Sequence, residues 1–256
     1  ETALALSLNT VAVKLALEVG PQAVVDTAHR LGITSELAPN ASIALGTSEV
    51  SVLELAGAYA PFANGGIGVV PHVIEEVKGT DGKVLFRREN NGPGRVMDPA
   101  YVAMMNRMLI QTLAMGTARR ASLPGWEAAG KTGTSQDYRD AWFVGYTARY
   151  VTAVWLGNDD SSPTKKASGA NLPVDVWSQY MQAAHKGVPV AELPGGLRSA
   201  GFGGMGYGQP GGTYLPPENV PEDRPPTGLG QTAQGGEPPM TLDRWFVETF
   251  LGGGRR

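Results

Sequence analysis

The apolar positions near the start of the chain follow a helical pattern that is interrupted at two glycines. Residues 10–19 are rich in apolar side chains and stop at Gly20, a residue type favoured just after a helix end. Pro21 can then occupy the first turn of a second helix, which Gly32 closes. The pattern therefore predicts two helices joined by a tight turn.

Two further helices are predicted from their start signals. Ser51 and Glu54 have the spacing of a capping box, which predicts a helix over residues 52–63. Asp98 followed by proline is typical of a helix start and predicts a helix over residues 100–113.

The remaining pattern indicates strands and one closing helix. Extended segments are predicted at residues 71–77, 83–86, 141–147 and 150–156. The last two are joined by a short turn, so we expect them to pair in antiparallel fashion. A helix is expected over residues 173–186. Helices, then strands, then a helix indicate an α+β fold with an antiparallel sheet rather than regular βαβ alternation.

The composition changes towards the C-terminus. Residues 194–239 contain 9 prolines and 13 glycines, and such a segment cannot bury enough apolar surface to offset its ordering entropy. We expect a Pro/Gly-rich flexible tail over residues 188–240. Residues 241–256 form a short, aromatic-rich amphipathic segment, expected to be either a weakly docked helix or a tether to a partner or membrane face.

Charge and composition give no support for several kinds of partner. The 21 basic and 24 acidic residues nearly balance, which gives no electrostatic footprint for nucleic acid, and no nucleic-acid partner is expected. The chain has no cysteine, and its histidines, His29, His72 and His185, have no ligand-like spacing. We therefore expect neither a metal site nor an organic cofactor.

The opening residues have the pattern of an internal stretch. The chain begins at Glu1, with no signal-peptide pattern and no apolar run long enough to span a membrane. Apolar residues are dense from the third position onward, as if they lay inside or beside a buried helix. We therefore expect a piece of a longer protein.

Residues 125–135, GWEAAGKTGTS, satisfy two catalytic patterns at once. From Gly125 the stretch matches the phosphate-binding loop G-x-x-x-x-G-K-T, and from Lys131 it matches K-T-G, a motif of β-lactamases and penicillin-binding proteins. A phosphate loop needs a strand before it and a helix after it, but turn formers here lead into a strand. The surroundings favour K-T-G, with Ser7-Leu8-Asn9, the only S-x-N in the chain, as its second element.

Longer stretches resemble the C-terminal part of the transpeptidase domain of class A, bifunctional penicillin-binding proteins. The resemblance covers residues 1–187 and is carried by SLNTVAVKLALEVG, SVLELAGAYAPFANGG, GKTGTSQDYRDAWFVGYT and LPVDVW. The stretch that begins at Asp140 follows K-T-G and resembles the sequence found after this motif in the bifunctional enzymes. The resemblance implies a β-lactamase/transpeptidase-like fold over residues 1–187 that is incomplete at its N-terminus.

The resemblance also implies a reaction, acyl transfer on peptidoglycan stem peptides that end in D-Ala-D-Ala. It gives catalytic roles to Ser7, Asn9 and Lys131, and substrate binding to Thr132, Gly133 and Thr134. The Ser7 hydroxyl would relay a proton to the leaving amine. Asn9 would hold the substrate amide and orient the lysine of the nucleophile motif, S-x-x-K. The Lys131 charge would set the local potential.

The Thr132 and Thr134 hydroxyls would bind the substrate carboxylate, and the Thr134 N–H would be an oxyanion donor. Without the resemblance, the same residues would equally fit a turn between helices and an ordinary strand.

The chain departs from the family pattern in one respect. The motif that supplies the nucleophile, S-x-x-K, does not precede Ser7, and its one match, Ser162 to Lys165, follows K-T-G and is not expected to be the nucleophile. We expect the nucleophile upstream of Glu1. Because loss of such a nucleophile costs about 10⁶ in turnover, we expect the 256 residues alone to be inactive, and also loosely folded.

Two rival functions remain open. A D,D-carboxypeptidase or β-lactamase would use water in place of the acceptor amine, whereas a penicillin-recognising sensor or scaffold would have no catalytic role. The resemblance further implies a parent with a glycosyltransferase domain, anchored at the periplasmic face of the bacterial inner membrane. Its partners would be stem peptides, β-lactams and, through the C-terminal tail, cell-wall synthesis proteins.

Overall fold

A three-stranded antiparallel sheet forms the centre of the computed structural model, which describes residues 1–89 and 92–196. Its strands are β3 (Ala129–Thr134), β4 (Asp140–Tyr146) and β5 (Val151–Gly157), in the order β3-β4-β5. The predicted pairing of the last two strands is confirmed, since β4 and β5 are antiparallel. The α+β class is confirmed as well.

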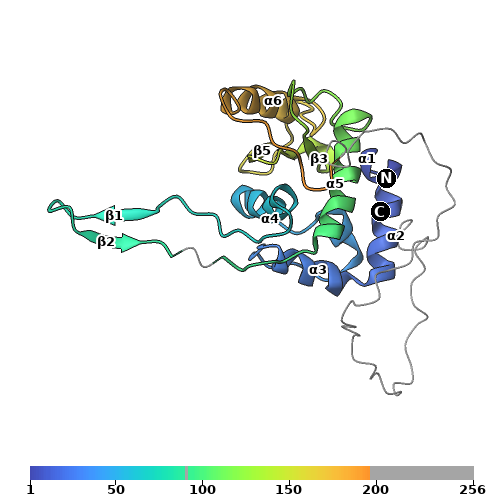
Figure 1. The fold of residues 1–256 in the computed structure, drawn as a ribbon. Coiled ribbons are helices and arrows are strands. Elements are labelled where there is room, and N and C mark those ends of the chain that lie inside the picture. The colour runs from blue at the N-terminus through green and yellow to red at the C-terminus, as the bar shows by residue number, and fades with distance from the viewer. Residues whose placement is uncertain (90–91, 197–256) are drawn as a thin grey trace, which may run out of the picture. The chain divides into compact units, whose positions relative to one another are not determined.

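Helices cover both faces of this sheet (Figure 1). The helices α4 (Val52–Asn64) and α5 (Pro99–Ala114) pack on one face, where α5 contacts β3 and α4 contacts β4 and β5. The helix α6 (Leu172–Ala184) contacts β4 and β5. The side chains of β4 show that α6 lies on the opposite face.

The alternation of side chains along β4 divides the core into two clusters. Phe143 points towards α6 and meets Trp177 edge-on, with ring centroids 5.3 Å apart. Tyr146 points the other way and packs with Phe62 of α4 and Leu109 of α5. Because successive strand residues face opposite sides, positions 143 and 146 serve opposite faces of the sheet. Both rings are fully buried.

Three helices open the chain. They are α1 (Thr2–Ala5), α2 (Asn9–Val19) and α3 (Pro21–Arg30). Gly20 separates α2 from α3 with a φ of 91°, a conformation that residues other than glycine rarely adopt. The α1 helix packs against α5, whereas α2 exposes apolar side chains such as Leu15 and Val19.

The predicted helix starts are confirmed at atomic level. The Ser51 hydroxyl accepts a hydrogen bond from the Glu54 N–H, and the Glu54 carboxylate accepts one from the Ser51 N–H, which completes the capping box of α4. The Asp98 carboxylate accepts a hydrogen bond from the Ala100 N–H at the start of α5. These contacts satisfy N–H groups that have no partner inside the helix.

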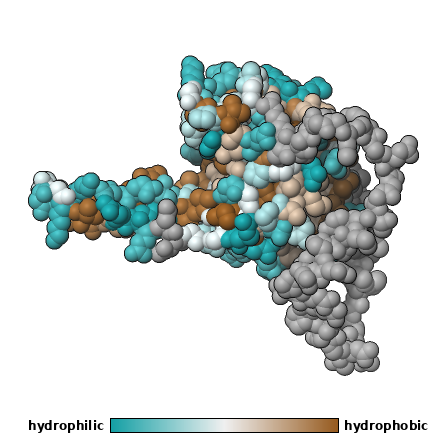
Figure 2. Space-filling model, viewed as in Figure 1, coloured by the Kyte–Doolittle hydropathy of each residue, from teal (hydrophilic) through white to brown (hydrophobic). Residues whose placement is uncertain are grey.

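The predicted hairpin exists but is shorter than expected. Its strands are β1 (Glu76–Lys78) and β2 (Val84–Arg87), and residues 71–75 are not strand. The hairpin extends away from the helices (Figure 1), and its apolar residues, such as Leu85, stand exposed among hydrophilic ones (Figure 2). Two strands alone have little apolar surface to bury, which limits how far pairing extends. A short 3-10 helix, η1 (Ala41–Leu45), precedes α4.

The segment from residue 188 was expected to be flexible, but residues 188–196 pack against the core. Leu193 is fully buried beside Tyr146, and the Asn106 side-chain amide donates to the Pro194 carbonyl oxygen at 2.9 Å. The buried Leu193 side chain and hydrogen bonds with Asn106, Arg149 and Glu127 hold this stretch, and the Pro/Gly composition does not reveal these contacts. Residues 197–240 and 241–256, the rest of the expected tail and the C-terminal segment, lie outside the described residues.

Within residues 1–89 and 92–196, no helix is both long enough and apolar enough to cross a membrane.

Candidate active site

The K-T-G residues lie on β3, an edge strand whose small residues allow close approach of its neighbours. A side chain at Gly130 would place its Cβ 2.6 Å from the Val144 carbonyl oxygen, so only glycine fits between β3 and β4. The Thr112 hydroxyl of α5 donates to the Gly130 carbonyl oxygen at 2.5 Å. The strand that carries Lys131 is therefore fixed by β4 and by α5.

Lys131 brings the two predicted motifs together. Its ammonium group donates a hydrogen bond to the Ser7 hydroxyl oxygen at 2.8 Å and another to the Thr132 carbonyl oxygen at 3.1 Å. The side chain is half-buried, and this burial lowers the pKa of Lys131 because the charged form loses hydration. The S-x-N and K-T-G motifs are thus in direct contact, although 124 residues separate Ser7 from Lys131.

Ser7 occupies the turn between α1 and α2 and is exposed, with a φ of 55°. This left-handed conformation is uncommon for residues other than glycine, and it directs the hydroxyl towards β3. Because the Ser7 oxygen accepts from Lys131, its own proton remains free to be donated elsewhere. Asn9 begins α2 and is exposed, and no other described residue hydrogen-bonds its side chain.

The two threonines of the motif differ in exposure and in partners. Thr132 is only 9% exposed, and its hydroxyl oxygen lies 2.5 Å from that of Thr117. Thr134 is exposed, and its hydroxyl accepts a hydrogen bond from the Gly169 N–H at 2.9 Å. Each hydroxyl has a protein partner and retains capacity for one more hydrogen bond.

Gly133 lies under the loop that precedes α6. A Cβ on Gly169 would come within 2.4 Å of the carbonyl oxygens of both Gly133 and Trp142, so this loop rests on the backbone of β3 and β4. No motif in the sequence singles out Gly169 or Thr117. Their contacts arise from folding alone, because Thr117 is 15 residues and Gly169 is 35 residues from its hydroxyl partner along the chain.

The phosphate-loop interpretation of residues 125–135 does not fit this structure. Lys131 lies inside a strand that pairs antiparallel with β4. After β3 the chain forms the three-residue 3-10 helix η2 (Gln136–Tyr138) and then β4, so no α-helix begins directly after the motif. A phosphate loop needs such a helix, because its N-terminal amides and dipole bind the phosphates.

The comparisons with known proteins agree with the K-T-G interpretation. The family model "Penicillin binding protein transpeptidase domain" matches residues 1–174. The chain belongs to this family. Penicillin-binding protein 1A from Aquifex aeolicus is 40% identical over 190 residues, which are 73% of this chain and 26% of that protein. The chain therefore spans about a quarter of the length of such curated relatives.

Solved structures confirm the transpeptidase fold. The penicillin-binding protein PonA1 from Mycobacterium tuberculosis aligns with a TM-score of 0.68 at 32% identity, covering 75% of this chain and 58% of that one. The structure of PonA1 in complex with penicillin V aligns with a TM-score of 0.65 over the same shares. The β-lactamase/transpeptidase-like fold expected from the sequence is confirmed by these alignments.

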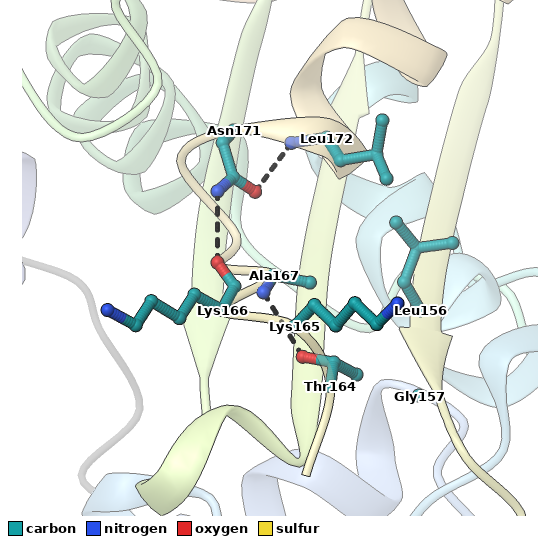
Figure 3. A pocket seen from close by; sticks show the side chains of 8 residues that line it. All are labelled: Leu156, Gly157, Thr164, Lys165, Lys166, Ala167, Asn171 and Leu172. Carbon is teal, nitrogen blue, oxygen red and sulfur yellow. Dashed lines mark hydrogen bonds between the residues drawn. The ribbon is translucent and has the colours of Figure 1, made fainter.

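The single S-x-x-K match of this transpeptidase-family chain lies apart from the Lys131–Ser7 contact. Lys165 lines a cavity of about 360 Å³ together with Leu156 and Gly157 of β5, and Figure 3 shows its side chain extended towards Leu156. Because β4 separates β5 from β3, the β5 residues that line this cavity lie two strands away from the strand of Lys131. No hydrogen bond joins Ser162 to Lys165 in the described part of the chain.

Proposed function

We propose that this chain is the C-terminal part of a peptidoglycan D,D-transpeptidase, which cross-links D-Ala-D-Ala stem peptides by acyl transfer. The observation that carries the proposal is the 2.8 Å hydrogen bond from the Lys131 ammonium to the Ser7 hydroxyl. It joins S-x-N to K-T-G in a member of the penicillin-binding transpeptidase family. A chance match of short motifs would not bring them into contact.

The proposal assigns the nucleophile to an S-x-x-K outside these 256 residues. That serine attacks the penultimate D-Ala carbonyl, the terminal D-Ala leaves, and the amine of a second stem peptide resolves the acyl-enzyme. Ser7 delivers its free proton to the leaving amine, while Lys131 holds the Ser7 oxygen and provides positive charge. Asn9 binds the substrate amide and orients the lysine of that S-x-x-K. Its exposed side chain has no hydrogen-bond partner among the described residues.

The exposed part of β3 receives the substrate. The Thr132 and Thr134 hydroxyls donate to the terminal carboxylate, and Gly133 leaves room for the substrate backbone beside the strand. The Thr134 N–H stabilises the oxyanion. The edge position of β3 supports these roles, because the edge opposite β4 carries backbone groups that a ligand can pair with.

The wider context of the chain belongs to the same proposal. Residues 1–187, together with the packed residues up to 196, form part of the transpeptidase domain of a penicillin-binding protein 1A-like parent with a glycosyltransferase domain. The parent acts at the periplasmic face of the bacterial inner membrane, and residues 197–256 contact other cell-wall synthesis proteins. Binding of β-lactams is supported by the PonA1 complex with penicillin V.

The test is product analysis on the full-length protein supplied with lipid-linked pentapeptide stem substrate. A transpeptidase yields cross-linked dimers, and the Lys131→Met variant, as the matched control, forms them about 10²- to 10³-fold more slowly. Stems trimmed by one D-Ala without dimers would instead show a D,D-carboxypeptidase. A stable penicillin adduct with neither product would show a sensor or scaffold.

A further inference from the structure

Thr117 contacts both sides of the Ser7–Lys131 pair. It lies in the segment that follows α5, and its N–H donates to the carbonyl oxygen of Ala5, the last residue of α1, at 3.1 Å. Its hydroxyl lies 2.5 Å from the Thr132 hydroxyl on β3. One half-buried residue therefore holds the end of α1 with its backbone and β3 with its side chain.

These contacts close a ring with the contact at the candidate site. Ala5 lies two residues before Ser7, and Thr132 directly follows Lys131. The bonds from Thr117 to Ala5 and to Thr132, together with the bond from Lys131 to Ser7, connect three segments in a closed ring. A closed ring fixes the separation of the Ser7 turn from β3 more strongly than the single Lys131 contact does.

The backbone on either side of Thr117 has no freedom to shift. A Cβ on Gly116 would lie 2.2 Å from the Ala5 carbonyl oxygen, so the chain passes α1 at the closest approach that glycine permits. Ala118 is fully buried, and its N–H donates to the Thr112 carbonyl oxygen at 2.9 Å. The Thr117 hydroxyl is therefore positioned by rigid neighbours on both sides.

The direction of the hydrogen bond between the two hydroxyls matters for substrate binding. Each hydroxyl carries one proton. If Thr117 donates to Thr132, the Thr132 proton is free to bind a carboxylate. If Thr132 donated to Thr117, Thr132 would present only lone pairs to the negative charge. A bound carboxylate thus selects the arrangement in which Thr117 is the donor. The Thr117 hydroxyl then fixes the Thr132 oxygen, so that the free Thr132 proton is oriented towards the carboxylate, and this orientation requires a hydroxyl at position 117.

We infer that Thr117 is a positioning residue that makes Thr132 a carboxylate donor and holds the Ser7 turn against β3. The inference rests on the proposed function, since it concerns recognition of the substrate carboxylate. It adds a residue that lies outside the S-x-N and K-T-G motifs.

The experiment compares two penicillins in the full-length protein: benzylpenicillin with its free carboxylate, and its methyl ester. The measured quantity is the second-order acylation rate with each, and their ratio gives the preference for the acid. In Thr117→Val we expect this preference to fall about 10- to 100-fold, the range of one hydrogen bond to a charged group. Thr117→Ser restores the hydroxyl and should retain the preference. A purely structural role would slow both penicillins alike and leave the ratio unchanged.

Thr117→Ala is a second variant without the hydroxyl, and it decides the matter if Thr117→Val does not fold. An acid preference that survives in the folded Val or Ala variant would overturn the inference while leaving the proposed function intact. Absence of acylation in the unmodified full-length protein would overturn the proposed function, and the inference with it.

Discussion

The two sides of the candidate site are supported in very different ways. On one side, Lys131 belongs to β3, which is paired with β4, packed under α5 and covered at Gly133 by the loop before α6. On the other, Ser7 lies in an exposed turn with left-handed backbone, and Leu6 and Leu8 beside it are each 45% exposed. In the proposed function, the strand carries the charge and the carboxylate donors, whereas the proton relay lies on the turn.

Because of this difference, substitutions on the two sides should affect the stability and the activity of the protein differently. Substitutions on β3 disturb both, because the strand is part of the core. Substitutions in the Ser7 turn are expected to lower activity and to leave most of the packing intact. The placement of the turn depends on few contacts, among them the Thr117 and Lys131 hydrogen bonds.

The largest effect is expected for Ser7→Gly in the full-length protein. We expect the acylation rate by penicillin to fall about 10²- to 10⁴-fold, the usual value of a positioned proton-transfer group. Glycine adopts a φ of 55° without strain, so the unfolding temperature should stay the same or rise. Stopped-flow acylation and thermal unfolding measure the two quantities. An acylation rate close to that of the unmodified protein would remove Ser7 from the mechanism.

Lys131→Met is expected to lower the acylation rate about 10²- to 10³-fold, the loss typical of one electrostatic contact to a developing charge. Burial lowers the pKa of Lys131 below its ordinary value of 10.5, so the unmodified protein should lose acylation rate as the pH rises through that lowered pKa. A pH–rate profile measured for both proteins checks this loss, which the methionine variant should lack.

The lowered pKa of Lys131 also determines how the free energy of unfolding changes with pH. Between the lowered pKa and 10.5, the unfolded chain binds more protons at Lys131 than the folded chain does, so the free energy of unfolding rises with pH there. Chemical denaturation at several pH values should show this rise in the unmodified protein and its absence in Lys131→Met. A fall with pH across the same interval would contradict the burial of this ammonium group.

Gly130→Ala tests how closely β3 is packed against β4. Its Cβ would meet the Val144 carbonyl oxygen at 2.6 Å, and we expect a loss of about 1–3 kcal/mol in the free energy of unfolding. Gly133→Ala is the matched control on the same strand, since its Cβ would meet only the Trp142 side chain, at 3.3 Å. Equal losses in the two variants, measured by chemical denaturation, would show that β3 is not held as described.

The smallest effect is expected on the β1–β2 hairpin. Leu85 is 66% exposed, so Leu85→Lys should change the free energy of unfolding by no more than about 0.5 kcal/mol and leave acylation unchanged. Chemical denaturation and acylation kinetics check both statements. A loss comparable to that of Gly130→Ala would mean that the hairpin contributes to the core.

The sequence was most informative where the determinants of structure are local. The Ser51–Glu54 capping box, the Asp98 cap and the turn between β4 and β5 depend on residues close together in the chain, and all three were predicted. The first hairpin strand was predicted too long, because local β-preference does not reveal how few pairing partners the strand has. The K-T-G and S-x-N motifs could be found, but their hydrogen bond could only be expected through the family resemblance.

Long-range contacts account for what the sequence could not reveal. Thr117 and Gly169 act on β3 from segments that no motif marks. Leu193 fills a space between α4, α5 and β4 that exists only in the folded chain. Its burial therefore cannot be predicted from the proline and glycine content of the segment. In both cases the partner is fixed by tertiary packing rather than by spacing.

In the proposed function, this chain carries the Ser7–Lys131 side of a transpeptidase site, while the nucleophile belongs to an S-x-x-K outside residues 1–256. The most direct measurement is to label the full-length protein and the 256-residue chain with fluorescent penicillin and to map the adduct by peptide mass spectrometry. We expect one adduct, on the serine of an S-x-x-K outside these residues, and no adduct on the isolated chain. An adduct on Ser162, or on any other serine of this chain, would show that the nucleophile lies within residues 1–256.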